Sequence, residues 1–105
     1  MKILFDQGTP VPLRRHLHPR PVATAAEMGW SGLSNGELLA AAEQAGFGIL
    51  ITTDQHLRHQ QNLAEWRIGI VVLTSTSWPR IRHKVREVAA AVDGLPSGGY
   101  AEVVI

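Results

Sequence analysis

The chain has 105 residues and a formal net charge of +1, and 45% of its residues are hydrophobic and 18% charged. We expect a single domain over residues 1–105, because this length supports one hydrophobic core. The composition is that of a globular chain, which excludes a disordered protein, and the apolar runs are too short for a membrane partner to be expected. The absence of cysteine and of an apolar leader predicts a cytoplasmic location.

Short apolar segments alternate with helical patterns along the chain. We expect strands at residues 3–5, 22–24, 49–52, 70–73 and 100–105. The third and fourth are continuous apolar runs, which are typical of strands covered on both faces. Amphipathic spacing predicts helices at residues 34–45 and 79–92, and shorter helices are expected at 10–17 and 55–64. The alternation predicts an α/β fold with a mainly parallel sheet.

Two aspartates follow predicted strands directly. Asp6 ends the run ILFD, and Asp54 ends the run ILITTD. Because the carboxyl ends of parallel strands meet at one edge of a sheet, where ligands bind, we expect both carboxylates at that edge. Clustered carboxylates without basic partners suit Mg²⁺ or Mn²⁺, which can activate water for phosphodiester hydrolysis. The structural alternatives are a helix cap for Asp54 and an Asx turn for Asp6.

Further polar residues near these aspartates also have two interpretations. Glu37 completes the capping-box pattern Ser34-x-x-Glu37, although the start of that helix could also point at the sheet edge. His56 and His59 are three residues apart and close to Asp54. They suit either a surface helix or a transition-metal site.

A basic stretch begins the helix predicted at residues 79–92, and its members are Arg80, Arg82, Lys84 and Arg86. The helix dipole disfavours cations at this end of a helix. A phosphate backbone or an acidic partner would offset that cost. The stretch is therefore either a solvated helix face or a contact surface for RNA.

The order and spacing of these motifs resemble those of the PIN-like domain family, short proteins often encoded beside toxin–antitoxin genes. The family pattern is a strand ending in Asp before a turn and Pro, then G-x-S-D at a helix start, then an apolar strand running into T-x-D-x-D-F. The segments MKILFDQGTP and GLSNGELLAAAEQAGFGILITTDQHL match this pattern over roughly residues 1–60. The resemblance implies a Rossmann-like, three-layer PIN-type fold with a central, mainly parallel five-stranded sheet. It also implies a Mg²⁺- or Mn²⁺-dependent ribonuclease site made of clustered acids.

Carried over residue by residue, the resemblance assigns metal binding and catalysis to Asp6 and Asp54. Glu37 is a further candidate for a catalytic acid, and Thr52 is a candidate supporting residue. These side chains would hold a Mg²⁺ or Mn²⁺ ion whose bound water attacks phosphorus.

Two departures from the family pattern concern the charge of this site. Asn35 stands where the family has Asp, and His56 stands where the second Asp of D-x-D would be. Each change removes a negative charge, which weakens binding of a hard cation. Asn35 and His56 are therefore expected to support the site or position the substrate. Gly8 also replaces the usual Asn of the turn.

Three functions remain open on these grounds. The first is a metal-dependent ribonuclease, a hydrolase that acts on RNA and is held by an antitoxin protein. The second is a PIN-fold protein without catalysis that acts as a binding module, and a homodimer is left open for either. The third is a receiver-like signalling domain with Asp54 as the phosphoacceptor and Thr74 or Ser75 after the fourth strand.

Overall fold

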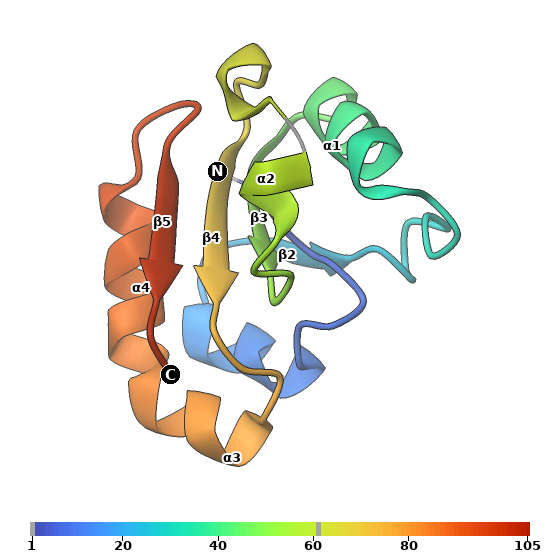
Figure 1. Cartoon of the computed structure of the whole chain (residues 1–105). Coiled ribbons are helices and arrows are strands. Elements are labelled where there is room, and N and C mark those ends of the chain that lie inside the picture. Colours follow the sequence, from blue (N-terminus) through green and yellow to red (C-terminus); the bar gives the residue numbers. More distant parts are fainter. Residues whose placement is uncertain (1, 61) are drawn as a thin grey trace.

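The computed structural model describes residues 2–60 and 62–105. Five parallel strands form one sheet in the order β2-β1-β3-β4-β5 (Figure 1). The strands are β1 (Lys2–Phe5), β2 (Val22–Thr24), β3 (Phe47–Thr52), β4 (Gly69–Leu73) and β5 (Tyr100–Val103). The prediction of a three-layer α/β fold around a five-stranded sheet is confirmed.

Helices of two kinds connect the strands. The α-helices are α1 (Asn35–Gln44), α2 (Leu57–Gln60), α3 (Trp78–Ile81) and α4 (Val85–Gly94). The 3-10 helices are η1 (Val11–Leu17), η2 (Leu63–Glu65) and η3 (Arg82–Lys84).

Four expectations about these elements need correction. The helix expected at 79–92 is not continuous, because η3 separates α3 from α4. The segment 10–17 forms a 3-10 helix instead of an α-helix. The helices α2 and η2 take up only part of 55–64. Residue 61 in that segment, like residue 1, lies outside the described residues. The last strand ends at Val103 rather than at Ile105, whose N–H donates to the Thr74 hydroxyl (2.8 Å).

Successive side chains of each strand point to opposite faces of the sheet, and both faces are buried. Phe5 belongs to a core that includes Leu13 of η1 and Val88 of α4. Leu4 belongs to a second core that includes Leu39 of α1. Figure 1 shows α4 and α1 on opposite sides of the sheet. The continuous apolar runs of β3 and β4 therefore have the cause that the sequence suggested.

The carboxyl ends of β1 and β3 form the topological switch point of this sheet. β1 and β3 are neighbours, yet β1 continues into η1, whereas β3 continues toward α2. Leu13 of η1 packs in one core and Leu57 of α2 packs in the other, so the two connections leave the sheet on opposite faces. Open α/β sheets bind ligands in the crevice that such a divergence creates.

Candidate functional site

Asp6 follows β1 directly and is half-buried at the carboxyl edge of the sheet. Its Oδ1 accepts a hydrogen bond from the Thr9 hydroxyl (2.8 Å), and its Oδ2 accepts one from the Thr52 hydroxyl. Both threonines are buried. Asp6 also lines a hollow of about 180 Å³ together with Asn35 and Trp30. The carboxylate is thus held in place by the protein and still borders open space.

Burial raises the pKa of Asp6, and hydrogen bonds from Thr52, Thr9 and the Gly8 backbone offset only part of this effect. The hydrogen-bond geometry supplies a second reason. The Thr9 hydroxyl has one proton but two acceptors at 2.8 Å, which are Asp6 Oδ1 and the carbonyl of Ile51. If Asp6 is protonated, it can donate to Thr9 while Thr9 donates to Ile51, and all three groups are satisfied.

Asp54 lies two residues beyond the end of β3 and is half-buried. Its Oδ2 accepts a hydrogen bond from Asn35 Nδ2 (2.9 Å), and its Oδ1 accepts one from the backbone N–H of His56 (2.9 Å). Asn35 Nδ2 also donates to Gln60 Oε1 (3.0 Å). Asp54 therefore closes a turn that precedes α2 and joins it to the start of α1; the expected cap of the helix itself is not formed, because the bond ends at His56 and α2 begins at Leu57.

The Thr52 hydroxyl connects the two aspartates. It donates to Asp6 Oδ2 and accepts from the backbone N–H of Asp54 (3.0 Å). Thr52 is 1% exposed, so no water competes for these bonds. Asp6 and Asp54 thus emerge from adjacent parallel strands at the same edge of the sheet and are fixed relative to each other by one buried side chain.

Glu37 occupies the third position of α1 and is exposed. Its Oε1 accepts from the Ser34 N–H (2.9 Å), and the Ser34 hydroxyl accepts from the Glu37 N–H (3.3 Å). These hydrogen bonds with Ser34 hold the pKa of Glu37 below its usual value. The capping-box prediction is confirmed. Within the described residues, no hydrogen bond joins Glu37 to Asp6 or Asp54.

His56 and His59 are exposed, and His56 reaches Asp54 through its backbone rather than through its ring. Among residues 2–60 and 62–105, no three His, Cys, Asp or Glu side chains gather closely enough to hold a metal ion. A three-ligand transition-metal site at these histidines therefore has no support in the geometry.

The basic stretch is distributed over three helical pieces instead of one helix start. Arg80 belongs to α3, Arg82 and Lys84 to η3, and Arg86 to the first turn of α4. All three arginines are exposed, and Arg80 Nη2 also donates to the carbonyl of Ile105 (2.9 Å). Because α3 follows β4, this stretch begins near the same sheet edge as Asp6 and Asp54.

The donor set at the switch point fits a weakly held Mg²⁺ or Mn²⁺ ion. Mg²⁺ is commonly bound by one or two carboxylates, with waters and substrate phosphates as its other ligands. Asp6 and Asp54 supply two carboxylates, each with lone pairs beyond those used in the bonds described. Asn35 turns its amide nitrogen toward Asp54, so it contributes a hydrogen-bond donor there and not an oxygen ligand. The oxygen-only chemistry is that of a hard cation.

Sequence reasoning missed the close approach of the Gly8 turn to the end of β3. A Cβ built on Gly8 would lie 2.3 Å from Thr53 Oγ1 and 3.8 Å from Asp6 Oδ1. It also missed Thr9, although the three-residue spacing of Thr9 from Asp6 is a signal for a side-chain-bonded turn. Gly8 is therefore not merely a replacement for Asn but part of the packing around Asp6.

Comparisons of the chain with protein-family models, with curated proteins and with solved structures give no significant match. The resemblance to the PIN-like family therefore rests on the motifs and their placement. None of the helices in the described part of the chain has the length and apolar character needed to cross a membrane.

Proposed function

We propose that the chain is a Mg²⁺- or Mn²⁺-dependent ribonuclease whose metal is held by Asp6 and Asp54. The observation that carries the proposal is the buried Thr52 hydroxyl, which bonds the Asp6 carboxylate and the Asp54 backbone at the switch point of the sheet. The order of the motifs, which resembles that of toxin–antitoxin-associated PIN-like proteins, supports RNA as the substrate. On the same grounds we propose an antitoxin protein as a partner and the cytoplasm as the location.

Each residue of the site has a distinct role in this proposal. When bound, the metal would lower the pKa of a coordinated water and neutralise charge on the phosphodiester. Asp6 and Asp54 supply the charged oxygen ligands. Thr52 fixes the position of both, and Asn35 orients Asp54 from the start of α1. The basic residues Arg82 and Arg86 are available for contacts with the RNA backbone.

A binding module without catalysis is the second candidate, and the small number of carboxylates favours it. In the described part of the chain no third acid joins Asp6 and Asp54 in a metal-binding group, and Asn35 places a neutral donor beside Asp54. In that case the fold would retain its partner surface while metal affinity is lost.

A receiver-like domain is the third candidate, because the strand order is that of flavodoxin-like sheets. Asp6, however, is followed by Gln7 rather than by the second acid that a receiver site needs. The Thr74 hydroxyl also accepts the N–H of Ile105. Failure of the protein to take up phosphate from acetyl phosphate would exclude this candidate.

A cleavage assay on 5′-labelled RNA tests the ribonuclease directly. With Mn²⁺ we expect products for the wild type and a loss of at least about 100-fold in rate for Asp6→Asn, since changes even to partners of metal ligands cost about 10–100-fold. Glu87→Gln, which removes an exposed acid of α4, is the matched control and should cleave at the wild-type rate. Equal rates for Asp6→Asn and wild type would show that the activity belongs to a contaminant.

A further inference from the structure

A second cavity lies beside the candidate metal site, along η1 and the edge strand β2. Its volume is about 570 Å³, and its basic lining consists of Arg14, Arg15, His18 and Arg20. The rest of the wall is apolar and includes three prolines and Val22 of β2. No carboxylate lines the cavity in the described part of the chain. We call this feature the arginine cavity.

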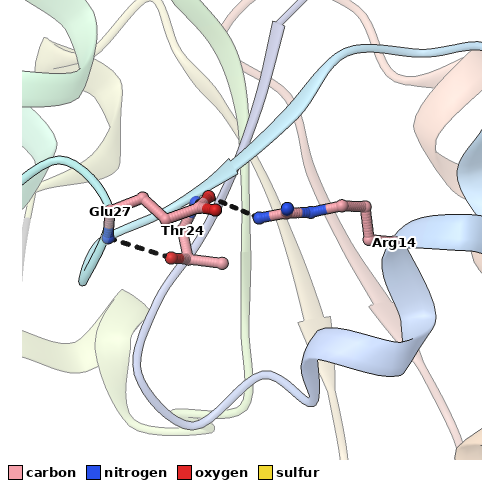
Figure 2. Close-up of polar contacts among 3 residues, drawn as sticks. All are labelled: Arg14, Thr24 and Glu27. Atoms are coloured by element: carbon pink, nitrogen blue, oxygen red, sulfur yellow. Dashed lines mark hydrogen bonds and ion pairs between the residues drawn. The ribbon is translucent and has the colours of Figure 1, made fainter.

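Two of its arginines are held in fixed positions by partners outside the cavity. Arg20 Nε donates to Asp93 Oδ1 of α4 (2.8 Å), and Arg20 Nη1 donates to the carbonyl of Leu17 (3.0 Å). Arg14 forms an ion pair with Glu27 (Figure 2). These partners restrict the side chains before any ligand binds, which lowers the entropic cost of binding.

Glu27 is itself held in place by two hydrogen bonds with Thr24. Its Oε1 accepts from the Thr24 N–H (2.9 Å), and its own N–H donates to the Thr24 hydroxyl (3.1 Å). Figure 2 shows Arg14 reaching across from η1 to this pair at the end of β2. The Arg14 Nε–H is buried and has no acceptor among the described residues. A buried donor without an acceptor costs free energy, so the contacts that hold Arg14 leave this group unsatisfied in the free protein.

The arginine cavity shares a wall residue with a hollow at Asp6. Val11 lines the cavity and also lines a hollow of about 110 Å³ whose wall contains Asp6, Thr9 and Thr24. Arg14 of the cavity pairs with Glu27, whose carboxylate accepts from the N–H of Thr24, a residue of the wall of the hollow. A chain molecule that extends from Asp6 past the exposed Val11 would reach the arginine cavity.

We propose that the arginine cavity binds a backbone phosphate of a single-stranded RNA whose neighbouring phosphodiester lies at Asp6. This inference rests on the proposed function and specifies how its substrate is held. Arginine is suited to phosphate because its planar group offers several donors, and the prolines and Val22 give an apolar wall for a ribose or base. A single strand can bend into a concave site, whereas a duplex presents a stiff backbone.

Binding of a fluorescein-labelled single-stranded RNA of ten nucleotides, measured by anisotropy in EDTA at several salt concentrations, tests this assignment. Arg15→Ala is the informative variant, because Arg15 is exposed and has no ion pair within the described residues. Arg67→Ala is the matched control, because Arg67 is exposed and precedes β4, which β1 and β3 separate from β2 in the sheet.

We expect Arg15→Ala to weaken RNA binding about threefold to tenfold and to reduce the slope of log affinity against log salt by about 0.7, the value for one phosphate contact on a single strand. Arg67→Ala should match the wild type in both quantities. An Arg15→Ala affinity within twofold of that of Arg67→Ala would overturn the assignment. Polyglutamate binding as tightly as the RNA, with the same loss in Arg15→Ala, would also overturn it and indicate an acidic protein segment.

This binding assay separates the cavity from the nuclease proposal, because EDTA removes metal and no cleavage is needed. Arg15-dependent RNA binding without any Mn²⁺-dependent cleavage would uphold the cavity and reject the ribonuclease. If cleavage requires Asp6 but RNA binding is unchanged in Arg15→Ala, the ribonuclease proposal would stand and the arginine cavity would be rejected.

Discussion

The side-chain amide of Asn35 donates a hydrogen bond of 2.9 Å to Asp54 Oδ2. Asn35 is the first residue of α1, and Asp54 follows β3, so this bond joins the helix start to the carboxyl edge of the sheet. A neutral donor at this position stabilises the Asp54 carboxylate without a cation. An acid in the same place would repel Asp54 unless a cation lay between them. Asn35 therefore sets the balance between the stability of the metal-free fold and metal affinity.

Asn35→Asp is expected to shift that balance toward the metal. The variant loses the bond to Asp54 and places two carboxylates together, so its metal-free Tm should fall by several degrees, since about 1 kcal/mol moves the Tm of a small domain by about 4–8 °C. Millimolar Mn²⁺ should then raise Tm by more in the variant than in the wild type. Thermal denaturation in EDTA and in Mn²⁺ measures both effects.

Gln44→Glu provides the control for Asn35→Asp, because it adds the same charge at the exposed last residue of α1. Its response to Mn²⁺ should equal that of the wild type. If Mn²⁺ raises the Tm of Asn35→Asp by no more than it raises the Tm of Gln44→Glu, the position of Asn35 is not part of a cation site.

The raised pKa of Asp6 predicts a pH-dependent cost to the metal-free fold. Burial raises the pKa of Asp6 above its ordinary value of 3.8, so the fold favours the protonated form. The stabilisation of the fold by the protonated carboxyl is complete at a pH below the pKa of Asp6 in the unfolded chain. It falls as the pH rises toward the pKa in the folded protein, and above that pKa the stability no longer depends on this group. Asp6→Asn removes this dependence. The Tm of Asp6→Asn should therefore exceed that of the wild type in EDTA at pH 7.5 by a few degrees, and the difference should shrink at pH 4.

The same titration governs metal binding with the opposite sign. Metal must displace the proton from Asp6, so the Tm increase caused by Mn²⁺ should be largest at high pH and fall as pH drops through the raised pKa. A Tm increase that is the same at pH 5 and at pH 8 would show that Asp6 is not a ligand.

Thr52→Val tests the hydroxyl that connects the aspartates. Valine keeps the shape of threonine but removes the donor to Asp6 and the acceptor of the Asp54 N–H. An unsatisfied buried group costs about 1–3 kcal/mol, which is the expected loss in the free energy of unfolding. The Mn²⁺-induced Tm increase should also disappear. Thr76→Val, a change at an exposed loop threonine, should leave both quantities unchanged in urea and thermal denaturation.

Gly8→Ala tests the packing of the turn after β1 against Thr53. The added Cβ would lie 2.3 Å from Thr53 Oγ1, so we expect a loss of about 1–3 kcal/mol, typical of overpacking. Thr53→Ala should remove most of this cost in the double variant, since the clash is with that side chain. Gly32→Ala is the control, because a Cβ there meets nothing within 4 Å. Additive losses in the double variant would contradict a direct contact between residues 8 and 53.

The sheet was predictable because its strands carry a signal that is local in sequence. Continuous apolar runs mark β3 and β4 as strands buried on both faces, and both cores bear this out. The capping box of Ser34 and Glu37 was equally readable, because its residues are three apart. The division of the last helix by η3 was not, since the spacing of Ile81, Val85 and Val88 suits a continuous helix.

The candidate site was only partly predictable, because its contacts join distant segments. Strand ends placed Asp6 and Asp54 at one edge, but nothing in the sequence shows that Asn35 bonds Asp54 across 19 positions. The ion pair of Arg14 with Glu27 was hidden for the same reason. Each depends on how η1 and α1 lie against the sheet, which is set by packing rather than by local pattern.

Anomalous difference density between Asp6 and Asp54 in an Mn²⁺-soaked crystal decides whether these two aspartates bind a metal ion. We expect a peak at about 2.0–2.3 Å from oxygens of both carboxylates, with Thr52 still bonded beside them. The peak should be absent from an Asp6→Asn crystal soaked in the same way. No peak in the wild type, with Asp6 still bonded to Thr9 and Asp54 to Asn35, would contradict the claim that these aspartates form a metal site.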